Sequence, residues 1–295
     1  MRMDGQETSS NVEDARSSSG GGRGFGFGGR SLGIGTVVIA LVGGMIFGVN
    51  PLTILGMLTG DGGASPMQTV PPGPRDAPPA DDAQAGFVSQ VLRSTEVVWT
   101  DIFNRSGKTY QDPKLTLFRG SYPTSCGLGQ SAMGPFYCPA DRHVYLDMNF
   151  FDTMRTQLGA PGQFAQAYVI GHEVGHHVQN LLGLTDKVAG LRQRGTDAQA
   201  NAMSVRLELQ ADCFAGVWAA RSQEVHGWRL EAGDIDAALN AASKIGDDAL
   251  QSKSHGQVMP ESFTHGSSAQ RVTWFKRGFD GGDVKRCDTF EVRNL

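Results

Sequence analysis

The sequence predicts an α+β domain that is mostly helical, has a small sheet and follows one transmembrane helix. Three observations support this fold class. Apolar residues recur at helical spacing in several long segments after residue 87. Two short segments in the same region alternate between apolar and polar residues, as half-buried strands do. The stretch from Leu32 to Leu58 contains no charged residue and is long enough to cross a bilayer.

The composition argues against one class of partner. The 295 residues carry a formal net charge of −4, and no stripe of basic residues accompanies an aromatic platform. We therefore expect no nucleic-acid partner. The chain has 40 glycines, which crowd residues 20–63. The glycine excess therefore belongs to the N-terminal region and not to the folded domain.

The N-terminal region divides into three segments. Residues 1–30 are rich in Gly and Ser and lack hydrophobic periodicity, which predicts a disordered tail. Residues 31–58 predict a transmembrane signal anchor. A cleaved signal peptide is the alternative, but the preceding polar region and the apolar run are both long for one. Residues 59–86 are rich in Gly, Pro, Ala and Asp, which predicts a flexible linker.

The positions of the basic residues predict the orientation of the anchor. Arg16, Arg23 and Arg30 precede the apolar stretch, and the next basic residue after it is Arg75. The positive-inside rule then places the N-terminus in the cytoplasm and the rest of the chain outside. We expect a single-pass protein of the cell inner membrane with a periplasmic, or otherwise extracytoplasmic, domain. The sequence predicts no oligomeric state.

A folded domain is expected over residues 87–295, which is long enough to bury a sizeable core. The two alternating segments predict strands at Leu115–Phe118 and His143–Met148. Helical spacing and helix start or stop residues predict six helices, the last one broken near Gly266. These helices are Phe87–Phe103, Phe150–Leu158, Gln163–Leu182, Ala198–Arg221, Asp234–Leu250 and Ser262–Phe279.

The four cysteines are Cys126, Cys138, Cys213 and Cys287. No C-x-x-C motif occurs, which argues against a structural zinc–cysteine site. An even number of cysteines in an extracytoplasmic domain permits two disulfides. Cys126 and Cys138 would close a loop of Gly, Ser and Pro residues, which leaves Cys213 for Cys287. The sequence does not fix this pairing, and reduced buried thiols are the alternative.

The predicted helix Gln163–Leu182 contains the motif H-E-x-x-H. His172 and His176 are four residues apart, so both imidazoles project from one helix face and can bind one Zn²⁺. Glu173 lies beside the first ligand, where it can take a proton from a water molecule activated at the metal and pass it to a leaving amine. His177 points about 100° away around the helix and is expected to be a packed or surface residue. The motif predicts one zinc ion per chain in a hydrolytic site.

A catalytic zinc site needs a third protein ligand and one open position. The metzincin solution is excluded, because Gln179 and Leu182 occupy the positions where that family has Gly and His. Glu208 and Asp212 share one face of the next predicted helix, which is apolar nearly all round. Glu208 can supply the third ligand. Asp212 can accept the free N–H of a ligand histidine and so fix its tautomer.

These motifs resemble those of known proteases. H-E-x-x-H combined with E-x-x-A-D resembles the gluzincin metallopeptidases, specifically the membrane-associated group of prenyl-protein and heat-shock zinc proteases. Over nearly its full length the chain also resembles the bacterial "putative neutral zinc metallopeptidase" family. Besides the Gly-rich lead to a single anchor, the matching stretches are Asn11–Asp14, Ser131–Pro139, Gly171–Gln179, Glu208–Trp218 and Phe263–Gly266.

The resemblance implies a zincin-like catalytic domain and peptidase activity on a protein or peptide substrate. At the positions that match the motifs of the family, it implies that His172, His176 and Glu208 bind zinc. It implies that Glu173 is the general base and that Asp212 supports a ligand histidine without binding the metal. It also implies a catalytic role for His265, with Arg271 a few positions later, as a hydrogen-bond donor to the oxyanion of the substrate carbonyl.

Two further expectations concern substrate binding and the alternatives to peptidase activity. In zincin folds an edge strand binds extended substrate by backbone pairing, and the resemblance permits that role for His143–Asn149. A turn or cap histidine is the alternative reading of His265. A zinc-binding scaffold that tethers partners to the membrane without turnover, or a hydrolase of non-peptide substrates, is the alternative to a peptidase.

Overall fold

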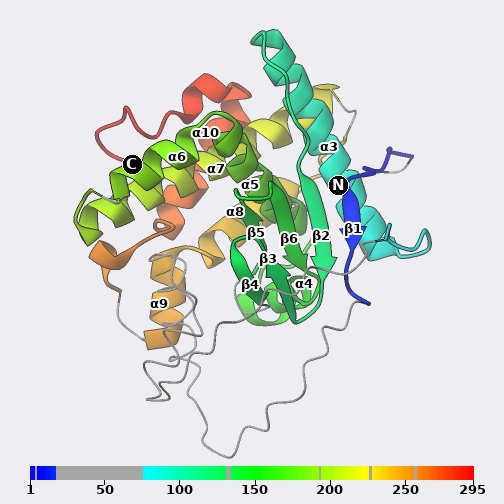
Figure 1. The fold of residues 1–295 in the computed structure, drawn as a ribbon, viewed down its shortest axis with the longest axis horizontal. Coiled ribbons are helices and arrows are strands. Elements are labelled where there is room, and N and C mark those ends of the chain that lie inside the picture. Colours follow the sequence, from blue (N-terminus) through cyan, green and yellow to red (C-terminus); the bar gives the residue numbers. More distant parts are fainter. Residues whose placement is uncertain (4, 18–75, 131–133, 193, 226–227, 256–257) are drawn as a thin grey trace, which may run out of the picture.

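The computed structural model describes residues 1–3, 5–17, 76–130, 134–192, 194–225, 228–255 and 258–295 (Figure 1). Within these residues the chain is mostly helical with two small sheets, so the predicted α+β class is confirmed. The predicted transmembrane anchor, residues 31–58, lies outside the described residues. None of the helices that the structure does describe is long and apolar enough to cross a membrane.

The larger sheet has four strands in the order β1-β2-β6-β5. The first three strands are parallel, and β5 runs antiparallel to β6. The strands are β1 Val12–Asp14, β2 Lys114–Phe118, β5 Phe136–Cys138 and β6 His143–Asp147. The predicted strands at Leu115–Phe118 and His143–Met148 are thus confirmed as β2 and β6. A separate hairpin pairs β3, Ser121–Thr124, with β4, Gly127–Gln130.

The expected substrate-binding edge at His143–Asn149 is wrong, because β6 is an internal strand. It pairs with β2 along its whole length and with β5 over its first three residues. The edge on this side of the sheet is β5, which the sequence did not predict. Its Tyr137 hydroxyl lies 3.0 Å from Nδ1 of His177 and accepts a hydrogen bond from the Asn180 amide at 2.9 Å. These contacts hold the edge strand against the helix that carries the H-E-x-x-H motif.

The longest helix, α7, packs against most of the other helices. It contacts α3, α5, α6 and α10, and its residues from Leu209 to Ala219 are buried almost without interruption. Burial on nearly every side explains why this segment of α7 is apolar all round. The helices are α3 Ala83–Arg105, α4 Asn149–Thr153, α5 Gln163–Leu181, α6 Leu184–Arg192, α7 Asp197–Val225, α8 Asp234–Lys244, α9 Asp247–His255 and α10 Ser268–Gly281. A π-helical turn, Met154–Leu158, follows α4, and 3₁₀ turns cover Pro260–Ser262 and Val284–Cys287.

The predicted helix Asp234–Leu250 is wrong as a single element, because the structure divides it into α8 and α9 at Gly246. A Cβ atom on Gly246 would lie only 2.4 Å from the backbone nitrogen of Ser268, so this position needs a glycine for the start of α10 to approach. The break places Asp247 at the first residue of α9. Its side chain there can reach the segment before α10.

The predicted disordered tail is wrong for the part that the structure describes. Residues 12–14 form β1, whose Val12 is buried beside β2. Three residues are too short for hydrophobic periodicity to reveal a strand, and this strand is stabilised by partners about a hundred residues away. The predicted C-terminal boundary of the linker, residue 86, is also too late, because α3 begins at Ala83. Asp82 caps α3 by accepting hydrogen bonds from the backbone N–H groups of Gln84 and Ala85, so residues 83–86 are helical.

Both expected disulfides are present. Cys126 is bonded to Cys138, and Cys213 is bonded to Cys287. The second bond ties the buried middle of α7 to the 3₁₀ turn near the C-terminus. It therefore anchors the C-terminal segment to the helix that carries Glu208 and Asp212.

Candidate metal centre

Two helices cross closely at the H-E-x-x-H motif, and glycines make that approach possible. A Cβ on Gly171 of α5 would lie 2.7 Å from the ring of Trp218. A Cβ on Gly175 would lie 2.9 Å from the backbone oxygen of Ala211. Real Cβ atoms do not approach other atoms this closely, so both positions require glycine at this spacing. The motif is therefore held directly against the part of α7 that contains Glu208 and Asp212.

This crossing brings together the three predicted metal ligands. Ligand atoms of His172, His176 and Glu208 all lie within 4.8 Å of one another. The Nε2 atom of His172 is 3.2 Å from one carboxylate oxygen of Glu208, and Nε2 of His176 is 3.5 Å from the other. Both imidazoles thus present the same nitrogen to a single carboxylate. Two imidazoles and one carboxylate are a common protein ligand set of catalytic zinc sites.

The remaining ring nitrogens have hydrogen-bond acceptors of their own. Nδ1 of His172 lies 2.9 Å from the Asp212 carboxylate, and Nδ1 of His176 lies 2.9 Å from the side-chain oxygen of Gln179. An acceptor at Nδ1 keeps the proton on that atom and leaves the Nε2 lone pair for a metal ion. The residues present therefore fit a zinc ion. A carboxylate behind His172 is the second contact that metal-ligating histidines usually make.

Asp212 is the centre of a buried ionic network. Its carboxylate is fully buried, accepts hydrogen bonds from Nε and Nη2 of Arg271 at 2.9 Å each, and accepts another from the Tyr168 hydroxyl at 2.5 Å. Burial opposes the charge on His172, but Asp212 and Glu208 outweigh it and raise the pKa of this ring to about 10. The surroundings therefore favour a positive charge at the ligand set, whether a proton or a metal ion supplies it.

Glu173, the predicted general base, is close to the ligand set but is not part of it. Its side chain is 7% exposed, between the two ligand histidines in sequence and on the same buried helix. Burial raises its pKa, while the neighbouring His172 and His176 oppose the shift. A carboxylate with a raised pKa is better matched to proton transfer near neutral pH.

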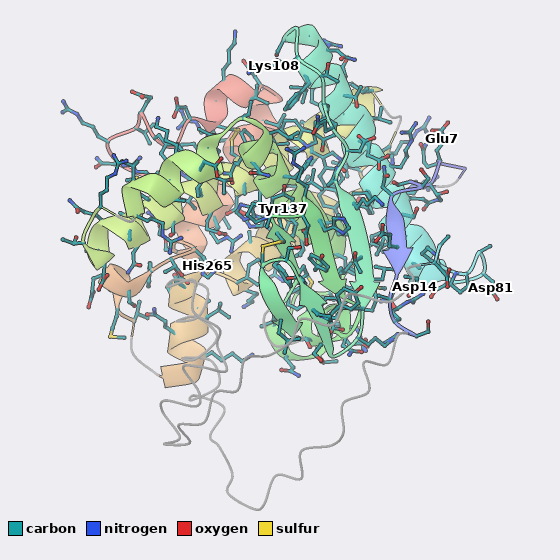
Figure 2. The ribbon with its side chains drawn as sticks, viewed as in Figure 1. Glu7, Asp14, Asp81, Lys108, Tyr137 and His265 are labelled. Atoms are coloured by element: carbon teal, nitrogen blue, oxygen red, sulfur yellow. A yellow bond between two sulfur atoms is a disulfide. The ribbon has the colours of Figure 1, made fainter. Side chains whose placement is uncertain are left out.

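His265 lies on the segment between α9 and α10 (Figure 2). Its Nδ1 is 3.0 Å from one oxygen of Asp247, whose other oxygen accepts the backbone N–H groups of residues 264, 265 and 266. A Cβ on the following Gly266 would lie 3.2 Å from Leu209, the neighbour of Glu208. Burial opposes protonation of His265, but Asp247 and Glu208 raise its pKa. The segment thus sits beside the ligand helix, with a ring that Asp247 orients.

Several contacts of the site were not predicted. Tyr168 is four residues before His172 and so lies on the same face of α5, a signal that the spacing contains. Nothing in the sequence distinguishes Asp247 as a site residue, because a carboxylate in the first turn of a helix is common. Arg271, which the resemblance placed with His265, bonds to Asp212 behind the ligands. His177 is fully buried with Nε2 2.6 Å from the Gln111 carbonyl oxygen, which confirms a packing role.

Replacing Gly175 by Ala should weaken zinc binding, because the added methyl group must push α5 away from the α7 backbone. Overpacking of this kind costs about 1–3 kcal/mol, while Ala in a helix gains up to about 1 kcal/mol over Gly. Gly190→Ala in α6 is the matched control, since no atom lies within 4 Å of its added Cβ. We expect Gly175→Ala to lower zinc affinity and Gly190→Ala to leave it unchanged, as measured by competition with a chromogenic chelator. Equal affinities in the two variants would contradict this account of the crossing.

Comparison with known proteins shows to which family the chain belongs. A family model described as "Putative neutral zinc metallopeptidase" matches residues 1–290. The Escherichia coli K12 protein named "Uncharacterized protein YpfJ" is 51% identical over 294 residues, covering 98% of this chain and 99% of its own. The Mycobacterium tuberculosis H37Rv protein named "Uncharacterized protein Rv2575" is 44% identical over 211 residues, covering 68% and 69%. No solved structure matches. The chain therefore belongs to the family described as putative neutral zinc metallopeptidases.

Proposed function

We propose that the protein is a zinc-dependent metalloendopeptidase whose single zinc ion is held by His172, His176 and Glu208. The observation that carries this proposal is the convergence of two Nε2 atoms on one carboxylate, with both Nδ1 atoms engaged elsewhere. When bound there, zinc supplies the Lewis acidity that polarises a scissile carbonyl and lowers the pKa of a coordinated water. The family description supports the metal and the reaction class.

Glu173 carries the proton in the proposed reaction. Its carboxylate takes a proton from the attacking water and delivers it to the nitrogen of the leaving amine as the peptide bond breaks. Its burial limits exchange of that proton with bulk solvent. Glu173 is therefore assigned as base and then acid, while the ligands keep their positions.

His265 is proposed to stabilise the negative charge that develops on the substrate carbonyl oxygen. Asp247 occupies Nδ1, so in the protonated ring Nε2 is the atom available to donate a hydrogen bond to the substrate. Asp247 and Glu208 raise the pKa of His265, which favours the protonated ring that can donate from Nε2. Asp212 and Arg271 act through the ligand His172 and do not contact the substrate in this proposal.

The catalytic domain is proposed to work outside the cytoplasm, and the two disulfides support this location. Disulfides form and persist in oxidising compartments and are rare in the bacterial cytoplasm. Membrane attachment through residues 31–58 stays a prediction from the sequence.

The proposed reaction predicts that Glu173→Gln keeps zinc and loses turnover. The amide has nearly the same shape as the carboxylate but cannot accept a proton, and loss of a general base costs at least about a hundredfold in rate. The measurement is cleavage of a proteome-derived peptide library, followed by mass spectrometry, with zinc content determined in the same samples. Glu291→Gln, at an exposed position on the C-terminal segment, is the matched control and should cleave like the parent.

Two outcomes would count against the proposal. Cleavage by Glu173→Gln at the parent rate would contradict the role of the base. Zinc bound by both proteins with no peptide cut by either would favour the alternative of a zinc-binding scaffold without turnover, or a non-peptide substrate. In the first case the peptidase reaction would stand without Glu173 as its base, and in the second the ligand set would stand without the peptidase reaction.

A further inference from the structure

The N-terminal segment is built into the folded domain. β1 is the outer strand of the four-stranded sheet and pairs in parallel with β2, so that Val12 lies opposite Leu115. Val12 and Ala15 are each only 4% exposed. Figure 1 shows β1 beside β2 and next to α3. Residues 12–15 therefore complete the sheet and part of its core.

Polar contacts hold the preceding residues to α3. The Ser9 hydroxyl donates to Glu96 Oε1 at 2.5 Å, and the Asn11 side-chain amide donates to the same oxygen at 2.9 Å. Glu96 is only 3% exposed, and Arg93 is farther from it, at 3.4 Å. A buried carboxylate needs hydrogen-bond donors. The N-terminal segment supplies the two nearest donors to Glu96, so this carboxylate of α3 depends on the segment for its two shortest hydrogen bonds.

The segment also contacts Asp76, the first residue that the structure describes after residue 17. The backbone N–H of Asp14 donates to the carbonyl oxygen of Asp76 at 2.7 Å. Arg16 bonds to Asp14 at 2.6 Å and to Asp82, the cap of α3, at 2.5 Å. Figure 2 shows Asp14 on the same side of the domain as Asp81. The two ends of the intervening chain are therefore held together by a hydrogen bond.

This contact limits how the apolar stretch between those ends can meet a membrane. A single crossing by the apolar stretch would place Asp14 and Asp76 on opposite sides of a hydrocarbon core about 30 Å thick. In the structure these two residues are joined by a backbone hydrogen bond. A cytoplasmic N-terminus with an extracytoplasmic domain is incompatible with this contact. We infer that residues 1–17 and the catalytic domain lie on the same side of the membrane, so that the chain between Asp14 and Asp76 makes no net crossing.

One consequence follows from the inferred arrangement. Arg16, one of the basic residues before the apolar stretch, is bonded to the domain at Asp82, so its position does not report a cytoplasmic N-terminus. This consequence does not depend on peptidase activity.

Cysteine labelling in the full-length protein tests the inference. Ser10→Cys places a thiol at an exposed position of the N-terminal segment, and Lys108→Cys places one at an exposed position after α3. Each variant is expressed in bacteria, and spheroplasts are treated with a membrane-impermeant maleimide before and after lysis. The parent is the control for specificity, because all four of its cysteines are in disulfides. A cytoplasmic marker protein must stay unlabelled before lysis.

We expect both introduced thiols to react to the same extent before lysis, with no gain after it. Labelling of Lys108→Cys before lysis and of Ser10→Cys only after lysis would overturn the inference, because the two positions would then lie on opposite sides. Labelling of both only after lysis would support the shared side and would contradict the proposed extracytoplasmic location. The result is separate from the test of turnover with Glu173→Gln.

Discussion

Replacing Asp212 by Ala should lower the free energy of unfolding by about 3–5 kcal/mol, because it leaves a buried guanidinium without its partner. The carboxylate is fully buried and Arg271 is only 2% exposed, so neither group can turn to solvent. The Tyr168 hydroxyl and Nδ1 of His172 would lose their acceptor at the same time. Urea denaturation of the metal-free protein measures this loss without a contribution from bound zinc.

The same substitution should also weaken zinc binding. Loss of a hydrogen-bond acceptor behind a metal-ligating histidine costs about 10–100-fold in metal affinity. Asp152→Ala is the matched control, since this carboxylate is on the surface, 71% exposed, and its ion pair with Arg155 contributes little. Unfolding of Asp212→Ala at the parent's urea midpoint would show that the buried network does not stabilise the fold.

Removing the disulfide between Cys213 and Cys287 by double substitution with Ala should destabilise the protein more than removing the one between Cys126 and Cys138. The chain-entropy model depends on the residues between the two cysteines, which are 74 apart in the first case and 12 in the second. It gives about 4.4 kcal/mol for the longer loop and about 2.8 kcal/mol for the shorter one.

Packing strengthens the difference between the two disulfides. Cys213 and Cys287 are both fully buried, so truncating them leaves a cavity at two buried positions, whereas in the other pair Cys138 is buried and Cys126 is exposed. The two double-Ala variants therefore serve as controls for each other in urea denaturation. A larger loss for Cys126→Ala/Cys138→Ala would contradict this account and would show that the hairpin loop, not the C-terminal segment, depends more on its bond.

The ligand set could be predicted because helix geometry fixes it. Residues four apart share a face, so His172 with His176, and Glu208 with Asp212, were each expected to act together. That the two faces meet could be inferred only from the chemistry of a metal site. The structure brings them together through glycines whose role depends on tertiary contact, such as Gly175 against the α7 backbone.

The parts that were missed depend on partners distant in sequence. β1 is three residues long and pairs with a strand about a hundred residues later, so neither periodicity nor composition reveals it. The break between α8 and α9 follows from the approach of α10 to Gly246, and local helix signals do not contain that contact. Asp247 gains its position beside His265 from the same break.

We propose that one zinc ion, held by His172, His176 and Glu208, makes this domain a peptidase. Protein freed of metal with a chelator allows a test in which peptide cleavage is followed as zinc is added back. We expect no cleavage without zinc, a rise in rate with each addition, and saturation at one zinc per chain. Cleavage by the metal-free protein, or saturation of zinc binding with no cleavage of any peptide in the library, would contradict the proposal.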